Sequence, residues 1–308
     1  MYDFDLIQPG TGTADARNAL TLGIEVTDGA AAMRCGLGVI DPQHGYGAGS
    51  DAPAAIEACM VAPLPPEGSR IVTIRPDLDS VGAMAMLNLR ASGKDLGDTV
   101  LERVRRIAAM DRFDRGPWPG ARPLPRTFDD LLSDGPGADL SALASAVVDR
   151  SMAVSERVVA VQHWLLTGEP PEWHAAASKA QAEALLRSLQ IGSTRLETAA
   201  NGRIGVVVSM EQGALALAYR LAPVIVALNP VFAFPDEIFG RKYTIAAWAD
   251  AAADLGRSLE CLSPLEPGWG GQARIKGSPQ AAPSRLPLHK VIYCVEQSLP
   301  KPHEGIAA

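Results

Sequence analysis

The stretch IVTIRPDLDSVGAMAML, residues 71–87, decides the fold class. Its first four residues, Ile71 to Ile74, are mostly β-branched and predict a buried strand that ends at Pro76. The small and apolar residues that follow predict a helix over 79–90. A strand that runs straight into a helix is typical of a parallel sheet with crossover helices.

The same alternation continues outward from this stretch toward the N-terminus and beyond residue 90. Strands are predicted over 20–27, 36–40 and 70–75, and helices over 51–60, 79–90 and 98–110. Asp51 is expected to cap the helix at 51–60, with Pro53 in its first turn. We therefore expect an N-terminal α/β domain with a parallel sheet and helices on both faces.

The C-terminal third predicts a second, smaller α/β domain. RIGVVVSM and APVIVALNP predict strands, GALALAYRL predicts a helix, and KYTIAAWADAAADLGRSL predicts a strand followed by a helix. The segment PGWGGQARIKGSPQ predicts a glycine-rich loop, and HKVIYCVEQSL predicts a last strand. Residues 138–198 read as two or three helices with few strand signals. The predicted division is an α/β domain over 1–135, a helical connector over 136–200 and an accessory α/β domain over 201–308.

Composition narrows the classes of partner. The chain has 308 residues, 47% of them hydrophobic, so it can bury a substantial core. A net charge of -7 argues against binding to duplex nucleic acid, which needs clustered Lys and Arg. The four cysteines form no CxxC pair and are expected to be buried reduced thiols. No long apolar segment indicates a membrane span, and we expect a cytoplasmic protein.

Three short segments place acidic or imidazole groups just beyond predicted strands or helices. They are IDPQHG with Asp41 and His44, RPDLDS with Asp77 and Asp79, and MDRFDRG with Asp111 and Asp114. Ligands bind at the carboxyl ends of strands in open α/β sheets, so these groups can converge there. Carboxylates and one imidazole suit Mg²⁺ or Mn²⁺.

Most of these residues also have an ordinary structural explanation. Asp79 with Ser80 is a credible cap for the helix that follows, whereas Asp77 has no such role in the sequence pattern. His44 is consistent with an ordinary loop histidine. Asp111 and Asp114 can equally pair with neighbouring arginines on a solvated helix end.

The segment at 71–87 resembles the first motif of the DHH phosphoesterase superfamily, in which a strand ends in His-x-Asp-x-Asp before a small-residue helix. Asp77 and Asp79 match the two metal-binding aspartates, and Arg75 stands where the family has histidine. IDPQHG is similar to the family's Asp-His-His signature, but it precedes the first motif instead of following it. MDRFDRG is similar to a later acidic segment of the family.

The glycine-rich segment resembles the phosphate-binding GGGGH-type loop of the family's accessory domain. Its members here are Gly268, Gly270 and Gly271, with Gln272 in place of the histidine and Arg274 and Lys276 as further cations. The ordinary interpretation is a glycine-rich turn. Trp269 within it is expected to pack in a core rather than stack on a base.

The resemblance implies a phosphoesterase that uses Mn²⁺ or Mg²⁺ and an activated water on a small phosphorylated or nucleotide-like substrate. Asp77 and Asp79 would hold the metal, with Asp41, His44 and Asp111 completing the site and Arg75 stabilising charge. The alternative is an inactive relative that binds a nucleotide or a protein, its aspartates paired with Arg75. Ser209 and Cys294 lie outside any nucleophile signature and are expected to be buried. The sequence is also compatible with a homodimer.

Overall fold

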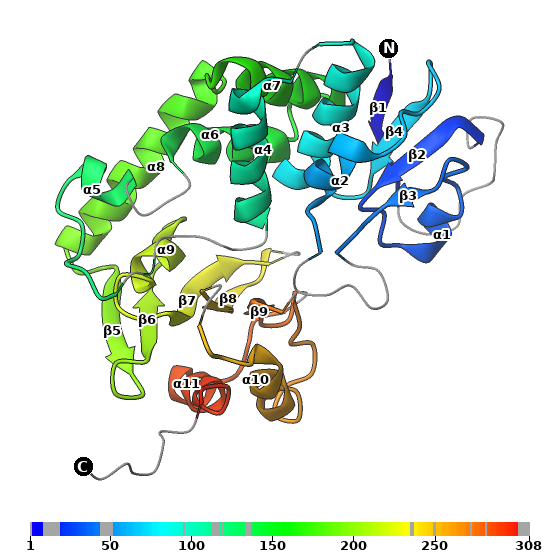
Figure 1. Ribbon diagram of the computed structural model, residues 1–308. Coiled ribbons are helices and arrows are strands. Elements are labelled where there is room, and N and C mark those ends of the chain that lie inside the picture. The colour runs from blue at the N-terminus through cyan, green and yellow to red at the C-terminus, as the bar shows by residue number, and fades with distance from the viewer. Residues whose placement is uncertain are drawn as a thin grey trace, which may run out of the picture. The chain divides into compact units, whose positions relative to one another are not determined.

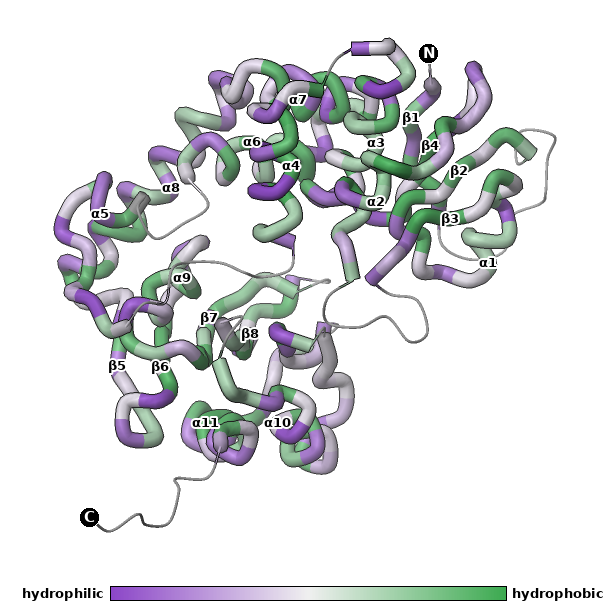
Figure 2. Tube along the Cα trace, in the orientation of Figure 1, coloured by the Kyte–Doolittle hydropathy of each residue, from purple (hydrophilic) through white to green (hydrophobic). Residues whose placement is uncertain are grey.

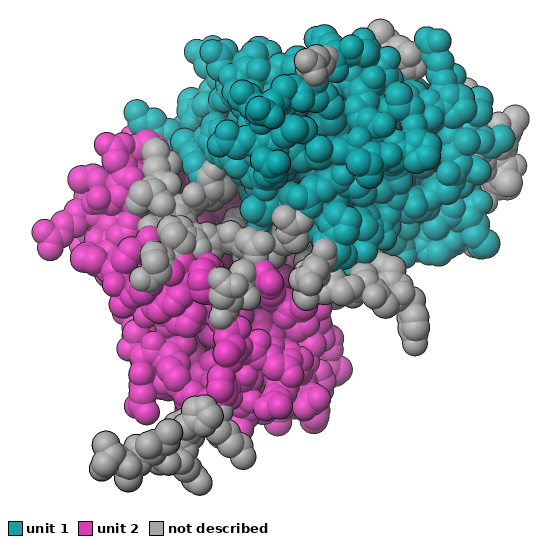
Figure 3. Space-filling view, in the orientation of Figure 1, with its two compact units in different colours: residues 1–112, 136–179 teal, residues 113–135, 180–308 magenta. Residues whose placement is uncertain are grey.

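The computed structural model (Figure 1) describes most of the chain as helices, strands and their connections. It describes residues 2–8, 19–43, 52–94, 96–111, 118, 120–132, 137–234, 237–248, 251–271, 273–280 and 282–300. Two compact units divide the chain (Figure 3), namely unit 1, with residues 1–112 and 136–179, and unit 2, with residues 113–135 and 180–308. Each unit contains one β-sheet with its own helices, which confirms the predicted two-domain α/β class.

Unit 1 is built on a parallel four-stranded sheet in the order β1-β4-β2-β3. Its strands are β1 (Asp3–Leu6), β2 (Thr21–Ile24), β3 (Val39–Ile40) and β4 (Arg70–Thr73). In β4, Ile71 enters the larger core and Val72 the core on the opposite face, as expected for a strand buried on both sides. Strand β1 was not predicted, because its sequence DFDL alternates acidic with apolar residues and has no β-branched residue.

Helices cover both faces of this sheet, as predicted. They are α1 (Gly29–Ala32), α2 (Ala55–Val61), α3 (Leu78–Ala91), α4 (Asp98–Asp111), α6 (Ala138–Val148) and α7 (Val154–Thr167). Helix α3 packs against α2, α4, α6 and α7 and is buried along nearly its whole length. Its small residues permit this close packing, and a Cβ on Gly82 would already crowd the Ile56 side chain.

The first turn of α2 differs from the prediction. Its N-cap is Ala54, so Pro53 precedes the cap instead of occupying the first turn. Asp51, the predicted cap, lies outside the described residues. The helix N-terminus is satisfied by a carboxylate from another part of the chain, which local sequence reasoning cannot see.

Helix α4 is amphipathic, with hydrophilic and hydrophobic residues along its length (Figure 2). Val104 and Ile107 are buried, and Arg106 forms a bidentate pair with Asp139 of α6 at 2.8 and 2.9 Å. The indole Nε1–H of Trp164 donates to the same carboxylate at 3.1 Å. Burial alone would raise the pKa of Asp139, but these hydrogen bonds and the guanidinium charge lower it.

Unit 2 contains a five-stranded sheet in the order β5-β6-β7-β8-β9. The strands are β5 (Arg195–Ala199), β6 (Ile204–Val208), β7 (Val224–Ala233), β8 (Phe239–Ala247) and β9 (Ile275–Gly277). Strands β6 and β7 are parallel, and the other neighbours are antiparallel. Strand β5 was not predicted, since the five residues RLETA are largely exposed and carry no apolar alternation.

Helices pack on both faces of this second sheet. They are α5 (Phe128–Leu132), α8 (Glu172–Gln190), α9 (Ala214–Ala218), α10 (Leu255–Leu262) and α11 (Leu288–Glu296). Ile225 of β7 packs in the core with α8 and α9, and Val224 and Val226 pack in the core with α10 and α11. Helices α10 and α11 lie side by side (Figure 1).

The prediction of a last strand at HKVIYCVEQSL is wrong, because this segment forms α11. Val291, Cys294 and Val295 recur at helical spacing and are fully buried, which is the pattern of a helix with one apolar face. Pro287 precedes the first turn and suits a helix start. The β-branched content misled the strand prediction.

The unit boundaries differ from those predicted at 135 and 200. Helices α6 and α7 belong to unit 1, because α7 packs against α3 and places Trp164 and Leu165 in its core. Helix α8 passes from unit 1 into unit 2 at 179/180. The segment 136–200 is therefore divided between the two cores.

The cysteines fall into two classes. Cys35 and Cys59 are free and buried, as predicted. Cys261 and Cys294 form a disulfide with their Cα atoms 5.4 Å apart, so the prediction of reduced thiols is wrong for this pair. A separation of 33 residues gave no signal of their pairing. No helix within the described ranges is long and apolar enough to cross a membrane.

Candidate functional site

Acidic residues gather at the carboxyl edge of the parallel sheet in unit 1. Glu25 follows β2, Asp41 follows β3, and Asp77 and Asp79 lie at the turn from β4 into α3. Asp111 ends α4. Glu25 donates its backbone N–H to Ile40 O at 3.0 Å, which fixes it beside the end of β3. We call these five residues the acidic edge.

Asp77 is the N-cap of α3. Its Oδ1 accepts the Ser80 N–H at 2.9 Å, and Ser80 Oγ accepts the Asp77 N–H at 3.0 Å, which completes a capping box. The sequence assigned the cap to Asp79 and saw no such role for Asp77, so this part of the prediction is reversed. The exchange follows from where α3 begins, one residue earlier than predicted.

Asp79 points away from its own helix and reaches the start of α2. Its Oδ2 accepts the Ala55 N–H at 2.6 Å and its Oδ1 accepts the Ile56 N–H at 2.9 Å. The side chain is 2% exposed. Burial, with repulsion from Asp111 and Asp77, raises the pKa of Asp79 to about 8, against the lowering effect of the two hydrogen bonds.

Glu25 is the member of the acidic edge that sequence reasoning missed. Its backbone has φ 51°, a left-handed conformation that is uncommon for a residue with a side chain. Burial raises the pKa of Glu25 to about 10, with further contributions from Asp77, Asp79, Asp111 and Asp41. The available signal was an acid directly after the buried run TLGI, the same pattern that singled out Asp41. It was overlooked because the strand was predicted to continue to residue 27.

The acidic edge thus brings together Asp41, Asp77, Asp79 and Asp111 with Glu25. Like charges in a partly buried place raise one another's pKa, and either protons or a cation can relieve the repulsion. The oxygen donors suit a hard divalent ion. Within the described residues, however, no three His, Cys, Asp or Glu side chains are arranged to hold a metal ion. His44 and Asp114 lie outside the described residues.

Arg75 does not form the salt-bridged cluster expected of an inactive relative. The residue is exposed, and in the described part of the chain no ion pair joins it to Asp77 or Asp79. Its carbonyl oxygen accepts the Ser80 hydroxyl at 3.2 Å. The backbone of Arg75 therefore supports the α3 turn, while its guanidinium faces solvent.

The glycine-rich segment of unit 2 closes on itself. Gly270 N–H donates to Gly277 O at 3.2 Å and Gly277 N–H donates to Gly270 O at 2.7 Å, which joins the segment to the end of β9. Gly271 has φ +136°, and a Cβ there would overlap the Ile275 carbonyl. Gln272 lies outside the described residues. Among the predicted phosphate ligands, Gly270 therefore has its amide engaged within the turn.

Of the cations predicted for this segment, Lys276 lies within β9 and Arg274 directly precedes that strand. Lys276 is 7% exposed and donates from Nζ to Gly271 O at 3.0 Å, which ties it to the turn. Burial lowers the pKa of Lys276, and the charge of Asp254 opposes this effect. Arg274 comes just before the strand, and its carbonyl accepts the Ala247 N–H.

Glu266 organises the same segment from within. Its Oε2 accepts the Trp269 indole N–H at 2.9 Å and the Ser284 hydroxyl at 2.7 Å, and its Oε1 accepts the Arg285 N–H at 2.7 Å. Trp269 is buried against Tyr243, with ring centroids 5.9 Å apart. The prediction that Trp269 packs in a core is confirmed.

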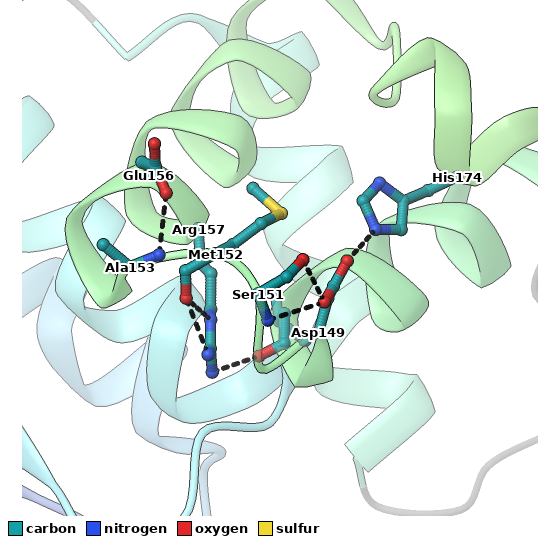
Figure 4. Close-up of polar contacts among 8 residues, drawn as sticks. Asp149, Ser151, Met152, Ala153, Glu156, Arg157 and His174 are labelled. Carbon is teal, nitrogen blue, oxygen red and sulfur yellow. Dashed lines mark hydrogen bonds and ion pairs between the residues drawn. The ribbon is translucent and has the colours of Figure 1, made fainter.

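A Ser, an Asp and a His also meet at the turn between α6 and α7 (Figure 4). Asp149 Oδ1 accepts the Ser151 hydroxyl at 2.7 Å, and His174 Nε2 lies 3.1 Å from Asp149 Oδ2. Because the carboxylate lies between them, the imidazole cannot take the serine proton as in a catalytic triad. Arg157 donates to Met152 O and Val147 O in the same turn. We interpret these hydrogen bonds as structural, because they connect the α6–α7 turn to α8 and join α7 to α6.

The remaining nucleophile candidates have structural roles. Ser209 is buried, and its hydroxyl lies 2.7 Å from Thr194 Oγ1 and accepts the Glu211 N–H at 3.0 Å, which confirms the predicted burial. Cys294 is buried and bonded to Cys261.

Comparison with known proteins adds little. No family model and no curated protein matches the chain. Among solved structures, it is similar to the pGpG-specific phosphodiesterase PggH from Vibrio cholerae, with 10% sequence identity and a TM-score of 0.39 over 85% of this chain and 92% of that chain. These values are too low for the activity of that protein to be transferred to this chain.

Proposed function

We propose that unit 1 is a metal-dependent phosphoesterase whose site is the acidic edge. The observation that carries the proposal is the convergence of five carboxylates at the carboxyl ends of parallel strands, where Glu25 and Asp79 have strongly raised pKa values. A divalent cation would relieve this repulsion, and the oxygen donors favour Mn²⁺ or Mg²⁺. The substrate class is a small phosphorylated or nucleotide-like molecule, and the location is cytoplasmic.

By type, carboxylate and imidazole donors suit such an ion, although no three of the described side chains lie in a coordinating arrangement. Asp77 and Asp79 would hold it, with Asp41, His44 and Asp111 as further ligands and Glu25 beside them. Each carboxylate oxygen has two lone pairs, so an oxygen that accepts a backbone N–H keeps one for a cation. A bound ion supplies Lewis acidity and a more acidic water.

The chain's own residues would orient the ligands and the substrate. Two backbone N–H groups of α2 hold the Asp79 carboxylate, and the capping box holds Asp77. Such outer contacts fix the direction of metal-binding carboxylates. The exposed guanidinium of Arg75 would bind phosphoryl oxygens, for which its planar fork is suited.

A second candidate is a nucleotide-binding protein without hydrolytic activity. The observation that favours it is that Asp77 and Asp79 both cap helices, a structural role that retains them without any metal. This candidate differs from the first in a measurable way, because it requires no divalent ion.

Elemental mass spectrometry after incubation with excess Mn²⁺ tests the proposal. We expect stoichiometric metal in the wild type and at least tenfold weaker binding in Asp77→Asn, since asparagine keeps the cap but loses the charge. Glu102→Gln, an exposed acid on α4, is the control and should bind normally. Hydrolysis of bis(p-nitrophenyl) phosphate with Mn²⁺ then tests catalysis. Absence of metal in the wild type would overturn the hydrolase and favour the second candidate, which requires no divalent ion. Metal binding without hydrolysis of this phosphodiester would overturn the proposed catalysis.

A further inference from the structure

The Cys261–Cys294 disulfide closes the part of unit 2 that contains the glycine-rich turn. Cys261 lies near the end of α10 and Cys294 near the end of α11, 33 positions apart. The chain between them holds Glu266, Trp269 and β9. One covalent bond therefore joins the two helices that precede and follow the turn.

The two cysteines differ in their exposure to solvent. Cys294 is 0% exposed and belongs to the core formed by β6, β7, α10 and α11. Cys261 is only partly buried and packs at the margin of that core. A thiolate from solution can therefore reach the disulfide at Cys261 more readily than at Cys294. Cys261 is therefore the cysteine that exchanges with a thiol or disulfide in solution, and the buried Cys294 is the one that resolves the mixed disulfide.

Apart from the disulfide, the contacts described for α11 and for the segment before it are noncovalent. Val291 and Val295 pack in the core, and Tyr243 Oη–H donates to Leu286 O at 2.9 Å ahead of the helix. Glu266 also accepts hydrogen bonds from Ser284 and Arg285. These are noncovalent contacts around a segment rich in glycine, whose backbone gains more freedom than most when a constraint is removed.

We propose that the Cys261–Cys294 pair is a thiol–disulfide switch that sets how firmly the glycine-rich turn and α11 are held. Accessible disulfides are reduced and re-formed more readily than fully buried ones, and Cys261 makes this bond partly accessible. The inference goes beyond the proposed hydrolysis and does not depend on it, because its readout is the order of unit 2. The free pair Cys35 and Cys59 in unit 1 takes no part.

The switch closes by exchange with a low-molecular-weight disulfide such as oxidised glutathione. The Cys261 thiolate attacks one glutathione sulfur, forms a mixed disulfide and releases one glutathione thiolate. The Cys294 thiolate then attacks the Cys261 sulfur and releases the second. Two electrons pass from the protein to the reagent, and the two thiol protons end on two molecules of glutathione.

Hydrogen exchange followed by mass spectrometry, on the full chain with and without dithiothreitol, tests this proposal. We expect two free thiols per chain after treatment with oxidised glutathione and four after reduction. Reduction should speed amide exchange in peptides covering 263–298 at least fivefold and leave peptides of α3 unchanged. Cys261→Ser should show the fast exchange under both conditions, whereas Cys59→Ser, the matched control, should respond like the wild type.

Two outcomes would overturn the proposal. One is four free thiols after treatment with oxidised glutathione, which would mean that the pair does not close. The other is equal exchange over 263–298 in the oxidised and reduced proteins, which would mean that the bond does not control the turn. Because chemical reduction needs no substitution, the test does not depend on whether a cysteine variant folds.

Discussion

The acidic edge of unit 1 and the glycine-rich turn of unit 2 treat their polar groups in opposite ways. At the acidic edge, Glu25 and Asp79 lie among other carboxylates, and burial with mutual repulsion raises their pKa values. In the turn, the Glu266 carboxylate accepts three hydrogen bonds and Lys276 donates to a loop carbonyl. The first region gathers like charges, and the second satisfies its polar groups internally.

This difference separates a candidate for binding from a structural element. A buried carboxylate with a full set of donors stabilises the fold and needs nothing further. Carboxylates that raise one another's pKa make the fold less stable than it could be, and bound protons or a bound cation would relieve that repulsion. A buried carboxylate therefore has a different role in the two regions.

The largest effect is expected from Gly271→Ala in the turn. Its positive φ and the overlap of a Cβ with the Ile275 carbonyl should cost roughly 3 kcal/mol of unfolding free energy. Gly270→Ala is the control, since its Cβ would meet nothing within 4 Å, and it should change stability by less than about 0.5 kcal/mol. Urea unfolding measures both. Equal losses would show that the turn is not closed as described.

Glu266→Gln should lower the free energy of unfolding by about 2 kcal/mol. The glutamine amide nitrogen would place a hydrogen-bond donor where a carboxylate oxygen now accepts a hydrogen bond. The exposed Glu260→Gln on α10 is the matched control and should be nearly neutral. Thermal unfolding followed by Trp fluorescence checks the comparison. A neutral Glu266→Gln would remove the contrast between the two regions.

At the acidic edge, replacing Asp77 or Asp79 with asparagine should change the free energy of unfolding by different amounts when a chelator is present. Asp79→Asn loses an acceptor for the Ala55 or Ile56 N–H and should cost about 1 kcal/mol. Asp77→Asn keeps its cap and should stay within about 0.5 kcal/mol of the wild type. Chemical denaturation in EDTA measures this pair, and the reverse order would contradict the assignment of the caps.

The smallest effect concerns pH and Lys276. Burial lowers its pKa in the folded protein below the ordinary 10.5, so the unfolded chain holds this proton more tightly. The stability of the wild type relative to Lys276→Met should therefore rise as pH increases through the folded pKa toward 10.5 and fall as pH decreases. Urea unfolding between pH 8 and 10.5 tests the sign, with Lys290→Met, at an exposed position, as the matched variant.

Local patterns in the sequence determined the α/β class, the parallel sheet and the segments that became β2, β4, α3 and α4. Burial of β-branched runs and helical spacing are properties of neighbouring residues, so they can be read from the chain. The same patterns placed Asp41 and Asp77 at strand ends. They failed for β1 and β5, whose residues show no strand pattern, and for α11, whose β-branched residues masked its helical spacing.

Only the tertiary structure decided which polar groups meet. Asp79 caps α2, which begins 24 residues earlier in the chain, and Glu25 joins the acidic edge through a strand neighbour. Cys261 pairs with Cys294 across two helices, and helices predicted as a connector complete the core of unit 1. The physical reason is that hydrogen bonds, repulsion between charges and covalent pairing depend on distances in space, which the order of residues does not fix.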